Sequence, residues 1–349
     1  MQSTPLPPDQ LVAWLARPDA ARDWLTSLGV RDVDRAHGNL VRMAESRLTL
    51  DLLTVVAQQL NEHLPQLSDA DMALNNLQRY IAAARNPLGL GALFERDAEA
   101  LPILLTIFSS SQFLSDYLVR DPEGYDLLRM TEGQPVARDV LIDEVRAEIE
   151  SLPDERTAMA ALRRIKRREL LRIAYGDLIR EQSIEVVTRQ ISFLADALCV
   201  GALQTAYTKL QQRRGMPLCK NGERCRFVIL ALGKLGGEEL NYSSDIDLMF
   251  LYEEDGRSDG EKSIDNREYF DRLGKEFIKI LTEATDLGSV YRVDMRLRPE
   301  GSQGAIASSL AGALGYYDVM GRTWERQAFV KARPVAGDLD LGREFLEQL

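Results

Sequence analysis

The sequence predicts an α+β protein that is mostly helical, and three observations point to this class. Apolar side chains recur every three to four residues through most of residues 1–212, which is the spacing of amphipathic helices. Two short aliphatic segments, 226–232 (RFVILAL) and 245–252 (DIDLMFLY), instead have the length and composition of strands. A helical pattern over 266–285 precedes another strand pattern over 289–301, so strands and helices alternate in this later part of the chain.

The change of character near Gly215 divides the chain into two expected regions. Residues 211–225 are polar, contain glycine and proline, and interrupt the helical pattern. We therefore expect a helical N-terminal region over residues 1–212 and a region of mixed strands and helices over residues 213–349.

Prolines divide the N-terminal region into separate predicted helices. Pro18 interrupts the pattern of residues 9–28, and Pro122 interrupts that of residues 109–128. Residues 154–212 form the longest helical stretch. Strand-like alternation is absent from this region, so we expect helices joined by short loops.

The longest helical stretch contains a basic segment, RRIKRREL, at residues 163–170, with five basic residues in eight. Such a segment either binds phosphate or acidic groups or forms the solvated face of an amphipathic helix, and the second interpretation is favoured. Arg172 lies among apolar neighbours and is expected to pair with Asp177 or another carboxylate.

The composition argues against nucleic acid and membranes as partners. The formal net charge is −11 and the pI is about 5.0, whereas proteins that bind nucleic-acid phosphates usually have a basic excess. No run approaches the roughly 18 consecutive apolar residues that a membrane span needs. Residues 1–10 lack the basic and apolar regions of a signal peptide. We therefore expect a cytoplasmic protein.

Cysteine and histidine provide little evidence for a catalytic or metal site. The three cysteines, Cys199, Cys219 and Cys225, are an odd number, as in a reduced cytosolic protein. Cys219 and Cys225 are spaced too widely for the usual zinc knuckle and lack a second pair. His37 and His63 are interpreted as ordinary helix or loop residues.

A glycine-rich turn follows the first predicted strand. Gly233, Gly236 and Gly237 in GKLGG leave backbone N–H groups that a phosphate can approach closely, because glycine has no Cβ. The turn matches neither the P-loop pattern nor the GxGxxG pattern of dinucleotide-binding domains. Alone it is weak evidence, since most such turns have only a structural role.

Two aspartates lie close together on the second predicted strand. Side chains alternate along a strand, so Asp245 and Asp247 share a face and lie about 7 Å apart. The opposite face carries the core residues Ile246, Leu248 and Phe250. Two carboxylates this close repel, and one keeps its proton unless a cation lies between them. Mg²⁺ suits such a site, because it binds a few carboxylates, water and phosphate oxygens.

A third aspartate completes the expected site. Asp294 shares a face of the strand over 289–301 with Arg296 and Arg298. If this strand is a neighbour of the strand over 245–252, its carboxylate meets the other two. Three carboxylates can hold two metal ions for in-line phosphoryl or nucleotidyl transfer. The alternative is that each aspartate is a helix cap or half of an ordinary ion pair, which explains a lone DxD better than this combination.

These motifs resemble the nucleotidyltransferase superfamily that includes polymerase β. More narrowly, residues 232–252, 291–304 and 316–338 resemble three successive blocks of the bacterial glutamine synthetase adenylyltransferases, also called adenylyl-removing enzymes. Residues 111–123 and 167–178 resemble the helical leader of that family. The likeness extends from about residue 80 to the end of the chain.

The resemblance implies a nucleotidyltransferase catalytic domain over residues 213–349, truncated before its C-terminal helical bundle. Full-length members carry two such units. One removes AMP from a tyrosine of glutamine synthetase by phosphorolysis, and the other attaches AMP from ATP. A single unit that follows Met1 and a helical leader is expected to be the removing unit of an N-terminal fragment. The attaching reaction and a catalytically silent module that binds nucleotide or protein remain open alternatives.

The resemblance also assigns roles to individual residues. Asp245, Asp247 and Asp294 are expected to be catalytic and to bind Mg²⁺, with two ions in the site. Phosphate or nucleotide contacts are expected from Gly236, Gly237, Ser243, Ser244, Arg296, Arg298 and Lys331. Ser243 and Ser244 equally well cap their turn. Glu325, Arg326, Lys331 and Arg333 are expected to line or brace the pocket or, equally well, to belong to a salt-bridged helix.

The expected partners are adenylylated glutamine synthetase, phosphate and ADP or ATP. A PII-type signalling protein is a further expected partner of the full-length enzyme.

Overall fold

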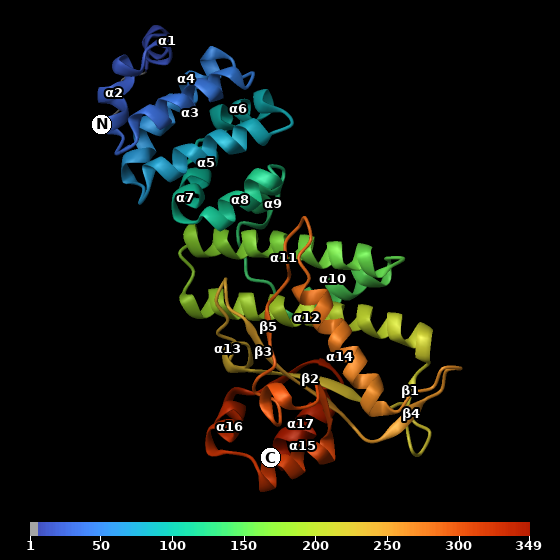
Figure 1. Ribbon diagram of the computed structural model, residues 1–349. Coiled ribbons are helices and arrows are strands. Elements are labelled where there is room, and N and C mark those ends of the chain that lie inside the picture. Colours follow the sequence, from blue (N-terminus) through green and yellow to red (C-terminus); the bar gives the residue numbers. More distant parts are fainter. Residues whose placement is uncertain (1–5) are drawn as a thin grey trace. The chain divides into compact units, whose positions relative to one another are not determined.

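The computed structural model describes residues 6–349, and the chain forms two compact units. The first unit consists of the residues up to Gln134 together with Ala174–Gln182. The second consists of Pro135–Ile173 and Ser183–Leu349 (Figure 1). The expectation that residues 1–10 are not a signal peptide falls partly on residues 1–5, which lie outside the described residues.

The first unit is helical. Its helices are α1 (Pro8–Ala16), α2 (Pro18–Ser27), α3 (Val33–Glu45), α4 (Leu50–His63), α5 (Ala70–Ala83), α6 (Pro87–Arg96), α7 (Ala100–Ser110), α8 (Gln112–Arg120) and α9 (Gly124–Thr131). The predicted interruptions are confirmed, because Pro18 begins α2 and Pro122 lies between α8 and α9. The Tyr80 hydroxyl of α5 donates a hydrogen bond to the Pro122 carbonyl at 2.9 Å, which fixes this break against the buried part of the unit.

The second unit combines long helices with two sheets. Its helices are α10 (Arg138–Glu150), α11 (Glu155–Leu178, whose last residues belong to the first unit), α12 (Ile184–Arg214), α13 (Gly233–Gly236), α14 (Asn266–Thr282), α15 (Leu310–Val319), α16 (Thr323–Ala328) and α17 (Leu339–Gln348). Its strands are β1 (Pro217–Cys219), β2 (Phe227–Leu232), β3 (Ile246–Tyr252), β4 (Gly256–Ser258), β5 (Val293–Asp294), β6 (Ala307–Ser309) and β7 (Arg333–Gly337). The expected mostly helical α+β fold is confirmed.

The larger sheet is mixed. Its strands follow the order β5-β3-β2-β7, and β6 also pairs with β3. β2 runs antiparallel to β3 and β7, whereas β5 and β6 run parallel to β3. β1 and β4 form a separate antiparallel ribbon. The central strand β3 therefore receives β5 beside its first residues and β6 beside its last ones.

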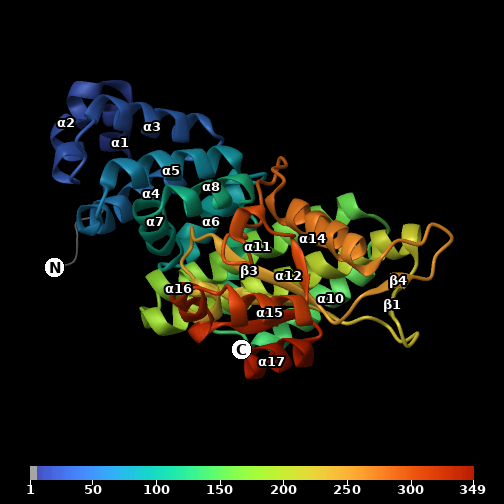
Figure 2. The same cartoon turned by 60° about the horizontal axis from the view of Figure 1, so that its bottom comes forward.

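Helices cover both faces of the larger sheet. On one face, Val228, Met249 and Leu251 pack with Tyr317 of α15 and Phe345 of α17. The other face carries a series of aromatic contacts, listed along the chain as Tyr207 of α12, Phe227, Phe250, and Phe270 and Phe277 of α14. Figures 1 and 2 show α15 and α17 on one side of β2 and β3 and α12 on the other. Residues 246 and 248–252 are buried, so β3 is a core strand whose polar site is confined to its beginning.

The strand predicted over residues 289–301 is much shorter in the structure. Only Val293–Asp294 pair with β3, and the chain then turns. The Arg298 guanidinium closes this turn by donating to the carbonyls of Met295 and Gly304 at 2.7 Å and 3.2–3.3 Å. Alternation therefore does not hold beyond Asp294, and the prediction that Arg296 and Arg298 follow it along the same strand is wrong.

Neither interpretation of the basic segment 163–170 describes Arg163 and Lys166. Arg163 is buried and donates to the carbonyls of Gly288 and Ile280 at 2.7 and 3.3 Å, near the C-terminal end of α14. Lys166 donates to the Val290 carbonyl and lies over the Tyr291 ring at 4.5 Å. These cations satisfy carbonyls at a helix end and fix the segment that leads into β5.

The helix α12 is long and apolar enough to cross a membrane, which the sequence analysis did not recognise. However, 72% of its apolar window is buried within the protein, as expected of a core helix. The expected boundary between residues 212 and 213 coincides with the end of α12, whereas the compact units divide at residue 134. Helices α10 and α12 belong to the same unit as the sheet because α12 packs on β7 and α14.

Candidate active site

The pairing of β3 and β5 brings the three aspartates to one end of the sheet. Asp247 is the direct register partner of Asp294 in the parallel pair β3–β5. Asp245 lies two residues before Asp247, just ahead of β3. The Ile246 amide donates to the Arg292 carbonyl at 3.0 Å, which extends the pairing backwards to Asp245. Three acidic side chains from two segments 47 residues apart therefore lie together.

An arginine holds each of the two outer carboxylates. The Arg292 Nε lies 2.5 Å from Asp245 Oδ1. The Arg296 guanidinium contacts both oxygens of Asp294, with Nε–Oδ2 at 2.8 Å and Nη2–Oδ2 at 2.5 Å. Among the residues that the structure describes, Asp247 has no ion-pair partner. The middle carboxylate therefore lies between two neutralised ones.

The environment shifts the pKa values of Asp247 and Asp294 in opposite directions. Burial raises the pKa of Asp247, and the negative charges of Asp294 and Asp245 raise it further. Hydrogen bonds from Arg296 hold the pKa of Asp294 below its usual range. The Arg296 charge offsets these effects only in part, and no described cation forms an ion pair with Asp247, so a bound cation would stabilise this carboxylate most.

Gly233 lies against the Asp247 carboxylate, where a larger residue would clash. Its φ is +55°, in the left-handed region that favours glycine. A Cβ at this position would lie 2.5 Å from Asp247 Oδ2. The glycine-rich turn therefore serves the carboxylate directly, a role that the sequence analysis did not assign to Gly233.

Gly236 and Gly237 have other neighbours. A Cβ on Gly236 would lie 2.4 Å from the Lys331 carbonyl oxygen, so this glycine permits the close approach of two chain segments. A Cβ on Gly237 would lie 2.9 Å from Lys331 Cδ. Lys331 itself pairs with Glu239 at 2.5 Å on the surface. The Gly236 carbonyl also accepts from Arg333 Nε at 3.2 Å. None of these contacts is with the aspartates.

Ser243 and Ser244 belong to the turn that enters β3. Ser244 Oγ accepts from the Asn241 amide at 3.3 Å, and the Ser244 amide donates to the Asn241 carbonyl at 3.2 Å. Ser243 is exposed, and its carbonyl accepts from Arg292 at 3.3 Å. Ser244 therefore caps the turn, which is one of the two roles expected for it. Arg298, expected at the phosphate, instead binds carbonyls of its own loop.

Two positions that the sequence analysis left unassigned support the site. Arg292 precedes Asp294 by two residues and pairs with Asp245. Its position two residues from Asp294 therefore could have indicated that it belongs to the site. Asp196 is fully buried on α12 and binds Arg333 Nη1 at 2.6 Å and Arg138 Nε at 2.6 Å. Arg333 in turn donates to the Leu235 carbonyl at 3.0 Å, so this cluster braces the turn α13 beside Asp247.

The remaining braces lie around α16. The Tyr316 hydroxyl donates to Glu325 Oε1 at 3.0 Å, and Glu325 Oε2 accepts from the Arg322 amide at 2.8 Å. Arg326 donates to the Tyr317 carbonyl. Glu325 and Arg326 therefore hold their own segment together, as bracing residues do.

The donor set is chemically suited to Mg²⁺, which prefers carboxylate oxygens. The three aspartates are adjacent, and their charges raise the pKa of Asp247. In the described part of the chain, their oxygens do not all come within 4.8 Å of one another, and arginines hold the outer two. An ion shared by all three therefore competes with Arg292 and Arg296 for Asp245 and Asp294.

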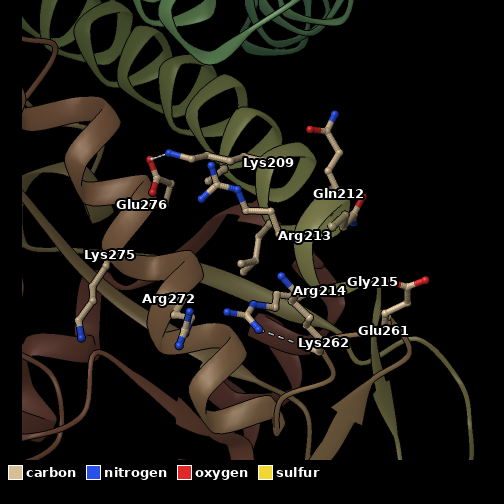
Figure 3. A pocket seen from close by; sticks show the side chains of 14 residues that line it. Lys209, Gln212, Arg213, Arg214, Gly215, Glu261, Lys262, Arg272, Lys275 and Glu276 are labelled. Carbon is tan, nitrogen blue, oxygen red and sulfur yellow. Dashed lines mark hydrogen bonds and ion pairs between the residues drawn. The ribbon is translucent and has the colours of Figure 1, made fainter.

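A separate cavity of about 840 Å³ lies between the C-terminal end of α12 and α14 and contains none of the predicted site residues (Figure 3). It is lined by several basic side chains. Lys209 pairs with Glu276 at 2.6 Å, and the Arg214 guanidinium donates to the Lys262 carbonyl. Arg272 and Lys275 likewise pair with Glu268 and Asp271. Part of the positive charge is therefore compensated within the fold, and the aspartate cluster remains the candidate active site.

Comparison with known families identifies the family of the chain. The model of the family "Glutamate-ammonia ligase adenylyltransferase" matches residues 101–348. The chain belongs to this family. The matched segment covers β2, β3 and β5, and with them the three aspartates.

Two curated relatives of this chain are each named bifunctional glutamine synthetase adenylyltransferase/adenylyl-removing enzyme. The chain is 40% identical over 250 residues to that of Thioalkalivibrio sulfidiphilus, a match that covers 70% of the chain. It is 39% identical over 292 residues to that of Pseudomonas aeruginosa, covering 82%. The matches cover 26% and 29% of those relatives' own lengths, so the chain corresponds to little more than a quarter of each.

Proposed function

We propose that this chain carries a magnesium-dependent centre that removes AMP from a tyrosine of glutamine synthetase by phosphorolysis. The observation that supports it is the β3–β5 register, which places Asp247 beside Asp294 with Asp245 two residues away. Acidic clusters of this kind suit in-line displacement at phosphorus, where positioning and charge compensation provide most of the catalysis.

In the proposed reaction, an oxygen of orthophosphate attacks the phosphorus of the tyrosine-bound AMP. The bond from phosphorus to the tyrosine oxygen breaks, the tyrosine oxygen takes a proton from water, and ADP is released. Mg²⁺, when bound, would compensate the charge on phosphate and on the departing oxygen. Asp245, Asp247 and Asp294 would hold the cation. Arg292 and Arg296 would be free to contact phosphate oxygens once they leave their carboxylates.

No side chain need act as a nucleophile or as a histidine base. Orthophosphate is already an anion at neutral pH, so the task of the protein is to orient it and to keep the two anions together. The rigid support of Asp247 by Gly233 and of α13 by the buried pair Asp196–Arg333 serves this positioning.

The direction of AMP transfer is proposed on the position of the catalytic unit behind a helical leader, rather than on any individual residue. Attachment of AMP from ATP is the second candidate, because the relatives' printed name includes both activities. The two reactions share a displacement at the same phosphorus, and the aspartate cluster serves either.

One experiment separates the candidates. The chain is incubated with adenylylated glutamine synthetase and Mg²⁺, with and without phosphate, and the subunit mass is followed. Loss of one AMP group that requires both phosphate and Mg²⁺ supports removal, and EDTA should abolish it. Gain of AMP by unmodified subunit with ATP supports attachment. Nucleotide binding with neither mass change would overturn the catalytic proposal.

A further inference from the structure

Two thiols and a carboxylate meet at the end of β3 that is opposite to the aspartates. Cys219 ends β1, Cys225 precedes β2, and Glu253 follows β3. One potential ligand atom from each of the three lies within 4.8 Å of the other two. Cys219 and Cys225 are buried and are free thiols. Sequence spacing argued against a metal at this pair, but it gave no indication of the third ligand.

The register of the hairpin favours an ion over a disulfide. The Cys225 amide donates to the Pro217 carbonyl and the Cys219 amide to the Glu223 carbonyl, both at 2.8 Å. The two cysteines are therefore diagonal neighbours on one face rather than direct partners. Diagonal Cα atoms lie about 7–8 Å apart, beyond the about 4.4–6.8 Å of a disulfide. A bridging ion spans the larger separation.

The carboxylate is already oriented as a ligand. Glu253 Oε1 accepts from Arg226 Nη2 at 2.8 Å. Oε2 accepts from the Arg226 amide at 3.2 Å and also faces the Cys219 thiol at 3.6 Å. Around a tetrahedral Zn²⁺, with Zn–S of about 2.3 Å and Zn–O of about 2.0 Å, the sulfur–oxygen separation is about 3.5 Å. This Cys219–Glu253 separation therefore already suits two ligands of one ion. A carboxylate held by an outer hydrogen-bond donor is also usual in metal sites.

We propose that Cys219, Cys225 and Glu253 bind one thiophilic divalent cation of the Zn²⁺ type, with water at a fourth position. Two thiolates and a carboxylate carry three negative charges, which the ion and Arg226 together balance. Binding displaces the two thiol protons to solvent. Cys225 and Arg226 line a cavity of about 340 Å³, which gives the ion a route from solvent. The ion would fasten the β1–β4 ribbon to β3.

The test uses Cd²⁺ as a spectroscopic probe on the full chain, reduced and stripped of metal with a chelator. We expect one Cd²⁺ per chain, with the ultraviolet charge-transfer band of cadmium–thiolate bonds, and displacement of Cd²⁺ by Zn²⁺. Cys219→Ala and Cys225→Ala should each abolish the stoichiometric band. Cys199→Ala is the matched control, because Cys199 is also a buried free thiol but lies within α12. Arg226→Gln should weaken binding about 10- to 100-fold, as loss of an outer partner does.

Circular dichroism of each metal-free variant shows whether that variant is folded. Glu253→Gln tests the contribution of the carboxylate to metal binding, because it leaves both thiols unchanged. Equal Cd²⁺ binding by the cysteine variants and the parent chain would overturn the proposal. So would the absence of stoichiometric Cd²⁺ or Zn²⁺ binding by the reduced chain. A Cys219–Cys225 disulfide in the oxidised chain, without metal uptake after reduction, would assign the pair to redox chemistry instead.

Discussion

Asp247 and Asp294 are direct partners in the register of two parallel strands, so the fold holds two carboxylates side by side. Arg296 binds Asp294 through both carboxylate oxygens, but in the described residues no cation binds Asp247. The asymmetry is visible in the pKa values, which are raised for Asp247 and lowered for Asp294. Two neighbouring carboxylates of this kind repel each other, and a bound cation would reduce the repulsion.

Asp247→Asn is expected to lower phosphate-dependent AMP release by about 10³-fold, the several kcal/mol that metal-assisted charge stabilisation provides. The melting temperature should stay the same or rise, because the substitution removes a charge from a partly buried acidic cluster. Mass spectrometry of the glutamine synthetase subunit and thermal circular dichroism measure the two effects. Asp255→Asn, at an exposed aspartate just beyond β3, is the control. Full activity of Asp247→Asn would exclude the cluster as the active centre.

Gly233→Ala is expected to disturb Asp247 without removing it. The new methyl group would lie 2.5 Å from Asp247 Oδ2, and alanine is strained at a φ of +55°. We expect AMP release to fall at least about 10-fold, since small misplacements of catalytic groups are costly. Gly315→Ala is the matched control, because a Cβ there meets nothing within 4 Å and the residue lies in α15. Equal rates for the two variants would contradict the role given to Gly233.

Asp196→Asn should destabilise the protein by about 3–5 kcal/mol, because it leaves two arginines beside a buried neutral group. Asp196 is fully buried and accepts hydrogen bonds from both Arg138 and Arg333. Urea unfolding followed by circular dichroism gives the free energy of unfolding. Asp139→Asn changes an exposed carboxylate 4.0 Å from the same Arg138 and should cost less than about 1 kcal/mol. Similar losses of unfolding free energy in Asp196→Asn and Asp139→Asn would mean that the burial of Asp196 with its arginines is unimportant for stability.

Glu155 should make stability depend on pH in the acid range. Partial burial opposes ionisation, but hydrogen bonds from Lys209 and Lys279 lower the pKa of Glu155 to about 2. Because this pKa lies below the usual 4.5, the stabilisation is present above pH 4.5 and is lost as the pH falls towards 2.

Glu155→Gln should therefore lower the free energy of unfolding by on the order of 1 kcal/mol at pH 7, the size expected of a partly exposed charge network. The difference from the parent chain should shrink between pH 4.5 and 2. Denaturant titrations at several pH values measure it, with Glu347→Gln, at an exposed position of α17, as the control. A difference that does not vary with pH would show that the ion pairs add nothing.

The sequence allowed the fold class and the acidic cluster to be predicted because both depend on local patterns. Alternation places Asp245 and Asp247 on one face, and the helical period of α14 fixes its buried face, with Phe270 and Phe277 among its residues. The prediction of the cluster then required only the assumption that β5 lies beside β3, and the strand register confirms this pairing.

Other features depend on contacts between segments far apart in the sequence, which a local pattern does not contain. Arg298 has the parity of a site residue, but the turn after Asp294 directs it to carbonyls of its own loop. Arg163 has the character of a surface cation, yet it satisfies the end of α14 more than 100 residues away. The site role of Gly233 likewise depends on a close approach to Asp247 across the β2–β3 connection.

The burial of α12 against the sheet has a practical consequence for dissecting this protein. A shortened chain beginning at residue 213 would lose Tyr207, whose ring packs edge-on against Phe227 of β2. It would also lose Asp196, the buried carboxylate that binds Arg333. Arg138 donates to that same carboxylate from α10. A shortened chain that keeps these contacts must therefore start ahead of α10, because α10 and α12 support an acidic cluster that is encoded far downstream.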